Sequence, residues 1–181
     1  IKSSFVVSGL DPHNTFINLV GSSNLNPDFL TQVNNIRYRG STARLFFILK
    51  NLPEIEGVNS DQMNTNFSIC TSMESLEKAS DGVKYGKISD TPFVDFNIPT
   101  ILNENFATNN QHILAASVQY APYHLHNQIW DDQTKFILKK NTLKVIENII
   151  PNFSNLIESS YVLSPQDIEN EFGLKEGNLN H

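Results

Sequence analysis

Residues 113–120 read Ile113-Leu114-Ala115-Ala116-Ser117-Val118-Gln119-Tyr120, and Ala121 and Pro122 follow directly. This short, mostly apolar run stops before a proline, so it predicts a buried β-strand that ends near Tyr120. Further along, residues 132–150 carry apolar side chains at helical spacing, with lysines and Glu147 on the opposite side. Such a stripe is typical of a helix that packs on a sheet.

The rest of the chain shows the same two periods. Strands are predicted at 41–50, 66–71 and 93–98, where alternate residues are apolar. Shorter helices are predicted at 12–20, 27–36, 73–79 and 165–172, on apolar spacing together with capping residues and prolines at their first positions. Because strands and helices do not alternate regularly, the order predicts an α+β fold: a mixed, largely antiparallel sheet with helices on one face.

The composition of the chain limits which partners it can bind and where in the cell it is expected. The net charge of −6 argues against nucleic acid as a partner, because such binding depends on Lys and Arg neutralising phosphates. No apolar run is long enough to form a transmembrane segment, which leaves only peripheral membrane contact open. The single cysteine, Cys70, cannot form an internal disulfide, and this favours a cytoplasmic location. Its strand-like neighbours predict a buried, structural thiol.

Motifs for nucleotide, hydrolase and metal chemistry are missing from the sequence. No G-x-G-x-x-G or Walker loop and no G-x-S-x-G elbow is present. His124 and His126 would face one way in an extended chain, but no third ligand accompanies them, so a surface or pocket-edge pair is favoured over a metal site. No metal site and no catalytic residue are assigned.

An amide and two tyrosines stand where the strand at 113–120 gives way to a loop. Gln119, Tyr120 and Tyr123, with Trp130 behind them, could line an apolar pocket that holds a few oriented polar groups. In a strand that stays regular to its end, Tyr120 and Tyr123 would face the pocket and Gln119 would bond to a neighbouring loop. The alternative is that the tyrosines pack the sheet edge with their hydroxyls in water, and the residues alone leave both open.

Four stretches, in order along the chain, together resemble the phytoene dehydrogenase-like family of FAD-dependent oxidoreductases, relatives of the carotenoid desaturases. They are VVSGLDPHNTF at 6–16, YRGSTAR at 38–44, VQYAPY at 118–123 with Trp130-Asp131, and LSPQDIE at 163–169 followed by FGL at 172–174 and GNLNH at 177–181. The Asn-rich stretch 103–111 departs from the family pattern, which affects a loop and not the fold.

The resemblance implies a flavoprotein whose FAD is held by an N-terminal dinucleotide fold and a C-terminal glycine-rich segment, both outside this chain. It divides the chain into a remnant strand and crossover (1–12), a substrate-binding domain (13–172) and the start of a return to the FAD domain (173–181). It also implies that Gly177, Asn178 and His181 lie near the flavin of the parent. This fragment alone is not expected to bind FAD.

The leading hypothesis is therefore the substrate-binding portion of an FAD-dependent oxidoreductase that acts on an apolar small molecule and is inactive alone. The orphan stretch Phe5–Val7 would pair with the missing FAD domain, or an exposed apolar face would cause self-association. The alternative is a non-catalytic α+β module that binds a protein partner.

Overall fold

The computed structural model describes residues 3–108 and 111–180 and has the predicted α+β fold. Five strands form one sheet: β1 (Thr42–Leu49), β2 (Phe67–Ile69), β3 (Phe93–Asn97), β4 (His112–Gln119) and β5 (Ile157–Leu163). The longer helices are a π-helix (His13–Gly21), α1 (Pro27–Asn34), α2 (Met73–Lys84), α3 (Asp132–Glu147) and α4 (Pro165–Phe172).

The sheet has the strand order β2-β3-β4-β1-β5, and every neighbouring pair is antiparallel. β1 lies between β4 and β5, so Phe47 pairs with Leu114 on one side and with Ser160 on the other. Alternate residues of β1, from Ala43 to Leu49, are fully buried, as the period-two pattern predicts. The ring of Phe47 meets that of Phe153 edge to face at 5.6 Å in the middle of this core.

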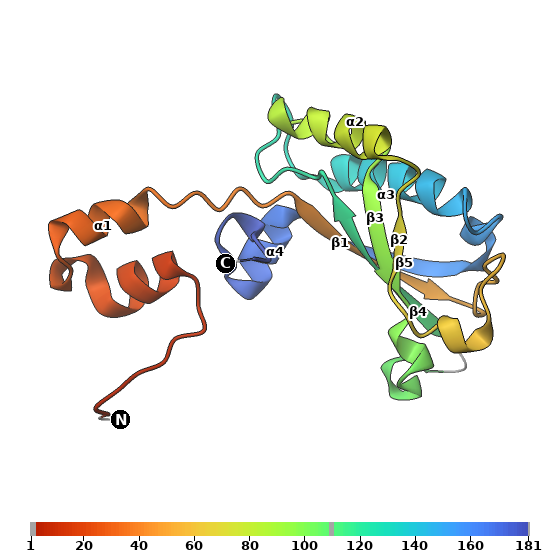
Figure 1. Cartoon of the computed structure of the whole chain (residues 1–181), viewed down its shortest axis with the longest axis horizontal. Helices are drawn as coiled ribbons and strands as arrows, with labels where there is room; N and C mark the ends of the chain where they lie inside the picture. Colours follow the sequence, from red (N-terminus) through yellow and green to blue (C-terminus); the bar gives the residue numbers. More distant parts are fainter. Residues whose placement is uncertain (1–2, 109–110, 181) are drawn as a thin grey trace.

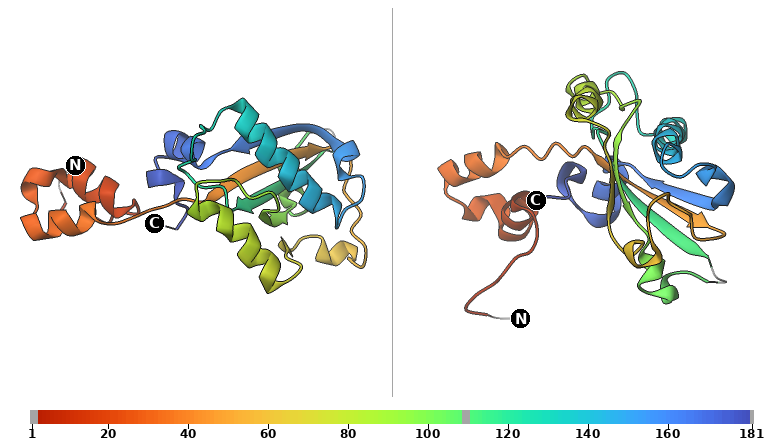
Figure 2. Two further views of the ribbon diagram at one scale, coloured as in Figure 1. Left: turned by 90° about the horizontal axis from the view of Figure 1, so that it is seen from above. Right: turned by 45° about the vertical axis from the view of Figure 1, so that its right-hand side comes forward.

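Helices α2 and α3 cover the core face of the sheet, as Figure 2 shows from above. Asp131 begins α3, because its carboxylate accepts the Thr134 N–H at 2.8 Å. Leu138 and Ile146 of α3 are fully buried against the strands. α2 begins at a Ser72 cap and buries only the small Ala79. Within the described chain no helix lies over the middle of the opposite sheet face.

The π-helix and α1 form an arm that stands apart from the sheet (Figure 1). Asp11 caps the first helix by accepting the Asn14 N–H at 2.9 Å, and Asn26 caps α1. The rings of Phe16 and Phe29 pack edge to face at 4.8 Å, but the arm buries little else. Residues 3–8 are irregular and exposed, so the pairing of Phe5–Val7 with another sheet stays a prediction.

The segments that lead into and out of the sheet lie side by side. The Arg39 N–H donates to a Glu176 carboxylate oxygen at 2.7 Å, and the Asn178 side chain donates to the Tyr38 carbonyl at 2.6 Å. Gly40 also touches the backbone of Glu176 and Gly177, since a Cβ at Gly40 would lie 2.1 Å from the Glu176 carbonyl oxygen. The segment that enters the sheet, residues 38–40, and the segment that leaves it, residues 176–178, are therefore in direct contact.

Three sequence-based expectations need correction. β5 is not predicted from the sequence, because Glu158, Ser159 and Ser160 interrupt its apolar pattern; three of its residues are exposed at the sheet edge. α2 continues to Lys84 through Gly82, where a Cβ would lie 3.1 Å from the Lys87 carbonyl oxygen, a tight contact. Cys70 is exposed and not buried, because it follows the edge strand β2.

No helix in the described part of the chain has the length and apolar character needed to cross a bilayer.

Candidate functional site

The sheet face opposite α2 and α3 is the strongest candidate for a binding surface. Its residues are those that alternate with the core, and most are half-buried. The strand pairing aligns Arg44 of β1, Ser117 of β4, Asp95 of β3 and Ser68 of β2 into one row across four strands. A polar row of this kind on a sheet face is not needed for packing, so it can serve recognition.

Hydrogen bonds fix the polar row in place. The Arg44 guanidinium donates to the Ser117 hydroxyl, and the Ser68 hydroxyl donates to an Asp95 carboxylate oxygen at 2.5 Å. Burial lowers the pKa of Arg44, as expected when a cation loses water. A hollow of about 400 Å³ lies over the row. It offers a cation at one end and a carboxylate at the other, which together can orient a polar group of a bound molecule.

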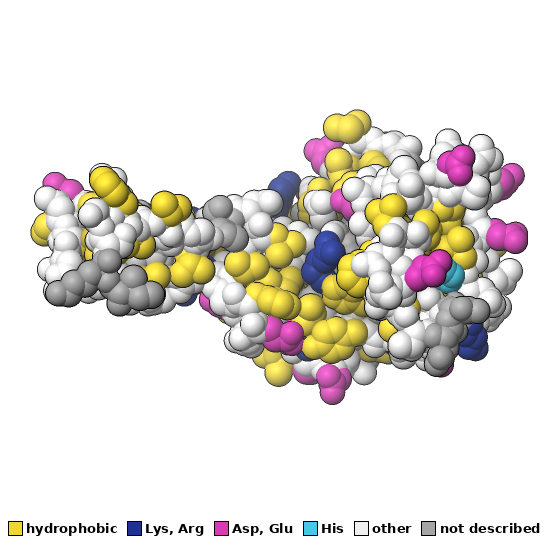
Figure 3. Space-filling model, turned by 90° about the horizontal axis from the view of Figure 1, so that it is seen from below, with side chains coloured by type: hydrophobic (Ala, Val, Ile, Leu, Met, Phe, Trp, Pro, Cys, Tyr) yellow, Lys and Arg dark blue, Asp and Glu magenta, His cyan; other side chains and the backbone are white. Residues whose placement is uncertain are grey.

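The neighbouring part of the same face is apolar. Phe46 pairs across the strands with Ala115 on one side and with Tyr161 on the other, and the Arg44 guanidinium lies 5.9 Å from the centre of the Phe46 ring. Tyr161 is anchored by a 3.0 Å hydrogen bond from its hydroxyl to Glu171, which raises the pKa of Tyr161. Figure 3, viewed from the side away from α2 and α3, shows apolar side chains gathered between the arm and the sheet.

Gln119 lies beside this polar row. Its side-chain amide donates to Asp95 at 3.4 Å, so it bonds to a neighbouring strand and not to a loop. Tyr120 ends the strand with a φ of +69°, a conformation that is strained for an aromatic residue. The Tyr120 carbonyl accepts the Ser89 N–H at 3.3 Å. The regular strand therefore ends at Gln119, and Tyr120 does not continue it.

Tyr123 and Trp130 lie away from the polar row. The Tyr123 hydroxyl donates to Glu169 of α4, and the Tyr123 N–H donates to the Gly40 carbonyl at 2.8 Å. The Trp130 ring is 8% exposed in the hydrophobic core, where its indole N–H donates to the Pro122 carbonyl at 3.0 Å. The structure thus brings Gln119, and not the full predicted set, to the open face; a substrate role for Tyr120, Tyr123 and Trp130 stays a prediction.

The residues predicted to lie near a flavin are engaged within the chain. Gly177 donates its N–H to the Leu174 carbonyl, and a Cβ there would lie 2.2 Å from the Pro165 carbonyl oxygen. Asn178 donates to Tyr38 from its side chain and accepts the Asn180 N–H at 2.8 Å. His181 lies outside the described residues. Contact of Gly177 and Asn178 with FAD stays a prediction for the parent.

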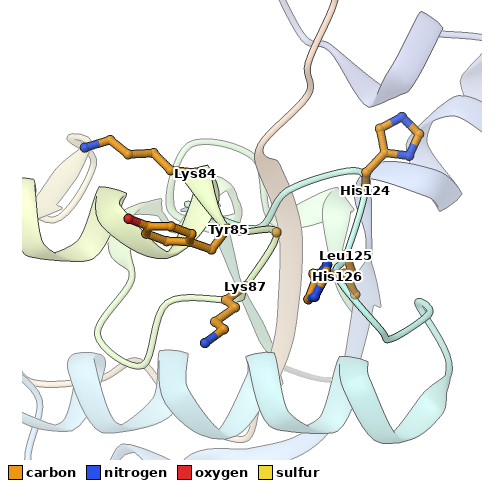
Figure 4. A pocket seen from close by; sticks show the side chains of 7 residues that line it. Lys84, Tyr85, Lys87, His124, Leu125 and His126 are labelled. Atoms are coloured by element: carbon orange, nitrogen blue, oxygen red, sulfur yellow. The ribbon is translucent and has the colours of Figure 1, made fainter.

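A second hollow, of about 620 Å³, lies between the end of α2 and the loop after β4. Figure 4 shows Lys87 and His126 on different sides of it, with the Lys87 side chain directed away from His126, while Lys84 also points away. The Lys84 ammonium pairs with Asp81 at 2.9 Å. His124 and His126 are exposed, as the sequence predicts, and no group of three metal-ligating side chains occurs among residues 3–108 and 111–180. This hollow is wide open and carries no chemistry of its own.

The sequence analysis overlooked Arg44, Ser117 and Asp95 as site residues. The sequence does contain a pattern that points to them. Each is a polar residue in an otherwise apolar strand, at a position that alternates with the core residues of that strand. What the sequence does not give is the register, which decides that these three residues stand opposite one another.

Fold and site together define an α+β unit with one sheet face packed under helices, while no helix of the described chain covers the middle of the other face. No family model matches the chain. Over 190 aligned residues it is 26% identical to the rat (Rattus norvegicus) protein called pyridine nucleotide-disulfide oxidoreductase domain-containing protein 2. It is 25% identical to the mouse (Mus musculus) protein of the same name. Each alignment covers 100% of this chain and 33% of the relative.

The chain therefore spans about a third of the length of the curated relatives it matches. Both relatives carry a pyridine nucleotide-disulfide oxidoreductase domain in their name. This likeness does not single out the phytoene dehydrogenases among the oxidoreductases.

Proposed function

We propose that this chain is the substrate-binding portion of an FAD-dependent oxidoreductase of the phytoene dehydrogenase-like kind, and that its substrate lies on the open face of the sheet. The observation that carries the proposal is the division of the sheet into two faces. One face forms the core, whereas the other combines the Arg44–Ser117 and Ser68–Asp95 hydrogen bonds with the apolar pair Phe46 and Tyr161. Such a surface suits a molecule with an extended apolar body and one polar group.

The paired connecting segments support a place within a larger protein. Tyr38–Gly40 and Glu176–Asn178 lie against each other through the Arg39–Glu176 and Asn178–Tyr38 hydrogen bonds. A domain inserted into another domain leaves and rejoins it at one place, because its two connections must be close together. The rest of the parent would then hold FAD and carry out the redox chemistry, while this chain binds and orients the substrate.

The residues of this chain have a limited part in that reaction. Arg44 and Asp95 would orient the polar group of the substrate, and Phe46 would exclude water from its apolar body. No step of electron transfer is assigned to the described residues.

Flavin content and ligand binding test the proposal. The full-length parent is expected to purify with stoichiometric FAD, and this chain alone with none. In the parent, Phe46→Ala is expected to weaken binding of a polyene probe such as phytoene by about tenfold, because a large buried ring contact is lost. Phe106→Ala is the matched control, since Phe106 is 58% exposed in a turn outside the sheet.

Three results would contradict the proposal: a parent without flavin, an isolated chain with tightly bound flavin, or equal effects of the two Phe→Ala changes. The first would favour the hypothesis of a non-catalytic interaction module.

A further inference from the structure

An apolar groove lies on the other side of the molecule, where α2, α3 and the edge of the sheet meet. It has a volume of about 210 Å³ and is separate from the hollow over Arg44 and Asp95. Its walls come from Leu76 and Ala79 of α2, Val145 of α3, Ile149 just after α3, Ile69 of the edge strand β2 and Phe93 of the neighbouring strand β3.

The groove exists because the two helices do not close over the sheet edge. α2 turns the small Ala79 inward, and a methyl group cannot fill the space in front of Val145. Side chains normally pack such gaps to close contact, and an apolar gap is a poor site for water. The groove is therefore suited to an aliphatic group supplied from outside.

One charged side chain stands at the rim. Lys78 of α2 lines the groove, no Asp or Glu does so among the described residues, and Lys78 takes no part in the ion pairs of the described chain. The protein has a net charge of −6, but at this place an ammonium group outside any ion pair of the described residues stands beside the apolar groove. A ligand complementary to both has an aliphatic body and a single anionic head.

We propose that this groove binds the aliphatic chain of a long-chain monocarboxylate, with the carboxylate on Lys78. The volume lies below the roughly 300–1,000 Å³ of pockets for drug-sized ligands, so the groove suits one narrow chain better than a fused-ring compound. The site is independent of the proposed oxidoreductase function, since it lies on the helix-covered side of the sheet.

Cys70 provides a reporter within the site. It is exposed, lines the groove and is the only cysteine of the chain, so a thiol reagent such as DTNB measures access to the groove directly. Laurate, dodecanol and dodecylammonium have the same chain length and differ in the head group. With the full 181-residue chain and ligands below their micelle concentrations, saturating laurate is expected to slow the reaction of Cys70 at least tenfold. Laurate should bind about three- to tenfold more tightly than dodecanol, and dodecylammonium more weakly than either.

Substitutions separate the two parts of the site. Lys78→Gln is expected to abolish the preference for laurate over dodecanol, whereas Lys50→Gln, at the far end of β1, should leave it intact. Ala79→Leu fills the groove and should remove protection by both ligands. If Ala79→Leu fails to fold by circular dichroism, Val145→Phe fills the same space from α3.

Three outcomes would overturn the proposal. They are unchanged Cys70 reactivity with laurate, an equal loss of preference in Lys78→Gln and Lys50→Gln, or protection that rises with protein concentration alone. The last would show that a second copy of the chain, and not a carboxylate, occupies the groove. Flavin content of the parent has no bearing on any of them.

Discussion

The hydrogen bond between Tyr123 and Glu169 affects the pKa of the tyrosine, which can be measured by titration. Its hydroxyl donates to Glu169 of α4, and this hydrogen bond to a carboxylate raises the pKa of Tyr123 to about 12. An unfolded tyrosine titrates near pH 10. The folded state therefore keeps its proton more firmly than the unfolded state, so the stabilisation is complete below about pH 10 and is lost as the pH rises toward about 12.

We expect the free energy of unfolding to fall between about pH 10 and pH 12 in the wild type, and to fall less in Tyr123→Phe. Phenolate absorbance should show a tyrosine that titrates at about pH 12 and disappears in this variant. Tyr85→Phe is the control, because Tyr85 is 69% exposed. If the late-titrating phenol persists in Tyr123→Phe, the assignment to Tyr123 is wrong.

At the scale of the elements, Gly40 and Gly177 allow close backbone contacts around the turn after α4. Gly40, before β1, lies against Glu176 and Gly177, and Gly177 lies against Pro165 of α4. A Cβ at Gly177 would lie 2.2 Å from the Pro165 carbonyl oxygen, and Gly177 also has a φ of +63°. Gly177→Ala is therefore expected to destabilise the fold by roughly 1–3 kcal/mol or more, since backbone on both sides must move. Chemical denaturation measures the change.

Gly9→Ala provides the comparison for that substitution. Nothing lies within 4 Å of a Cβ at Gly9, so its effect should stay within about 0.5 kcal/mol. Equal stabilities of the two variants would mean that the segments before β1 and after α4 do not pack as described.

The predictability of the elements from sequence follows from how much each one buries. β1, β4 and α3 form the core, so their apolar periods are complete and their positions are predicted correctly. β5 has one covered side and polar residues at 158–160, and its strand pairing with β1 comes from contacts distant in sequence. The polar row of Arg44, Ser117 and Asp95 needed the strand register for the same reason. Gln119 was found because it adjoins a strand end that the sequence does mark.

At the scale of the whole molecule, the arm and the irregular residues before it leave much apolar surface in water. Leu19 is 69% exposed and Val7 97%, and the arm has no core beyond Val33 and the Phe16–Phe29 pair. Exposed apolar patches of this kind usually meet another surface. We expect the isolated chain to self-associate, with sedimentation that depends on concentration, and the double variant Val7→Ser/Leu19→Ser to reduce this association.

Ile129→Ser tests whether self-association depends on the arm or on the exposure of any apolar side chain. Ile129 is 71% exposed, but in the loop before α3 and outside the arm. It should leave association unchanged. A chain that stays monomeric at all concentrations would contradict this role of the arm.

The closeness of Tyr38 to Asn178 and of Gly40 to Gly177 also has a consequence for protein engineering. A segment whose two ends lie close together can be inserted into a surface loop of a host protein without separating the ends of that loop. The segment's own contacts already hold its ends together, so the insertion adds little loop-closure entropy cost. Residues 38–178 are such a segment. The same geometry allows a short peptide to join the two ends and new termini to be opened in an exposed turn elsewhere in the unit.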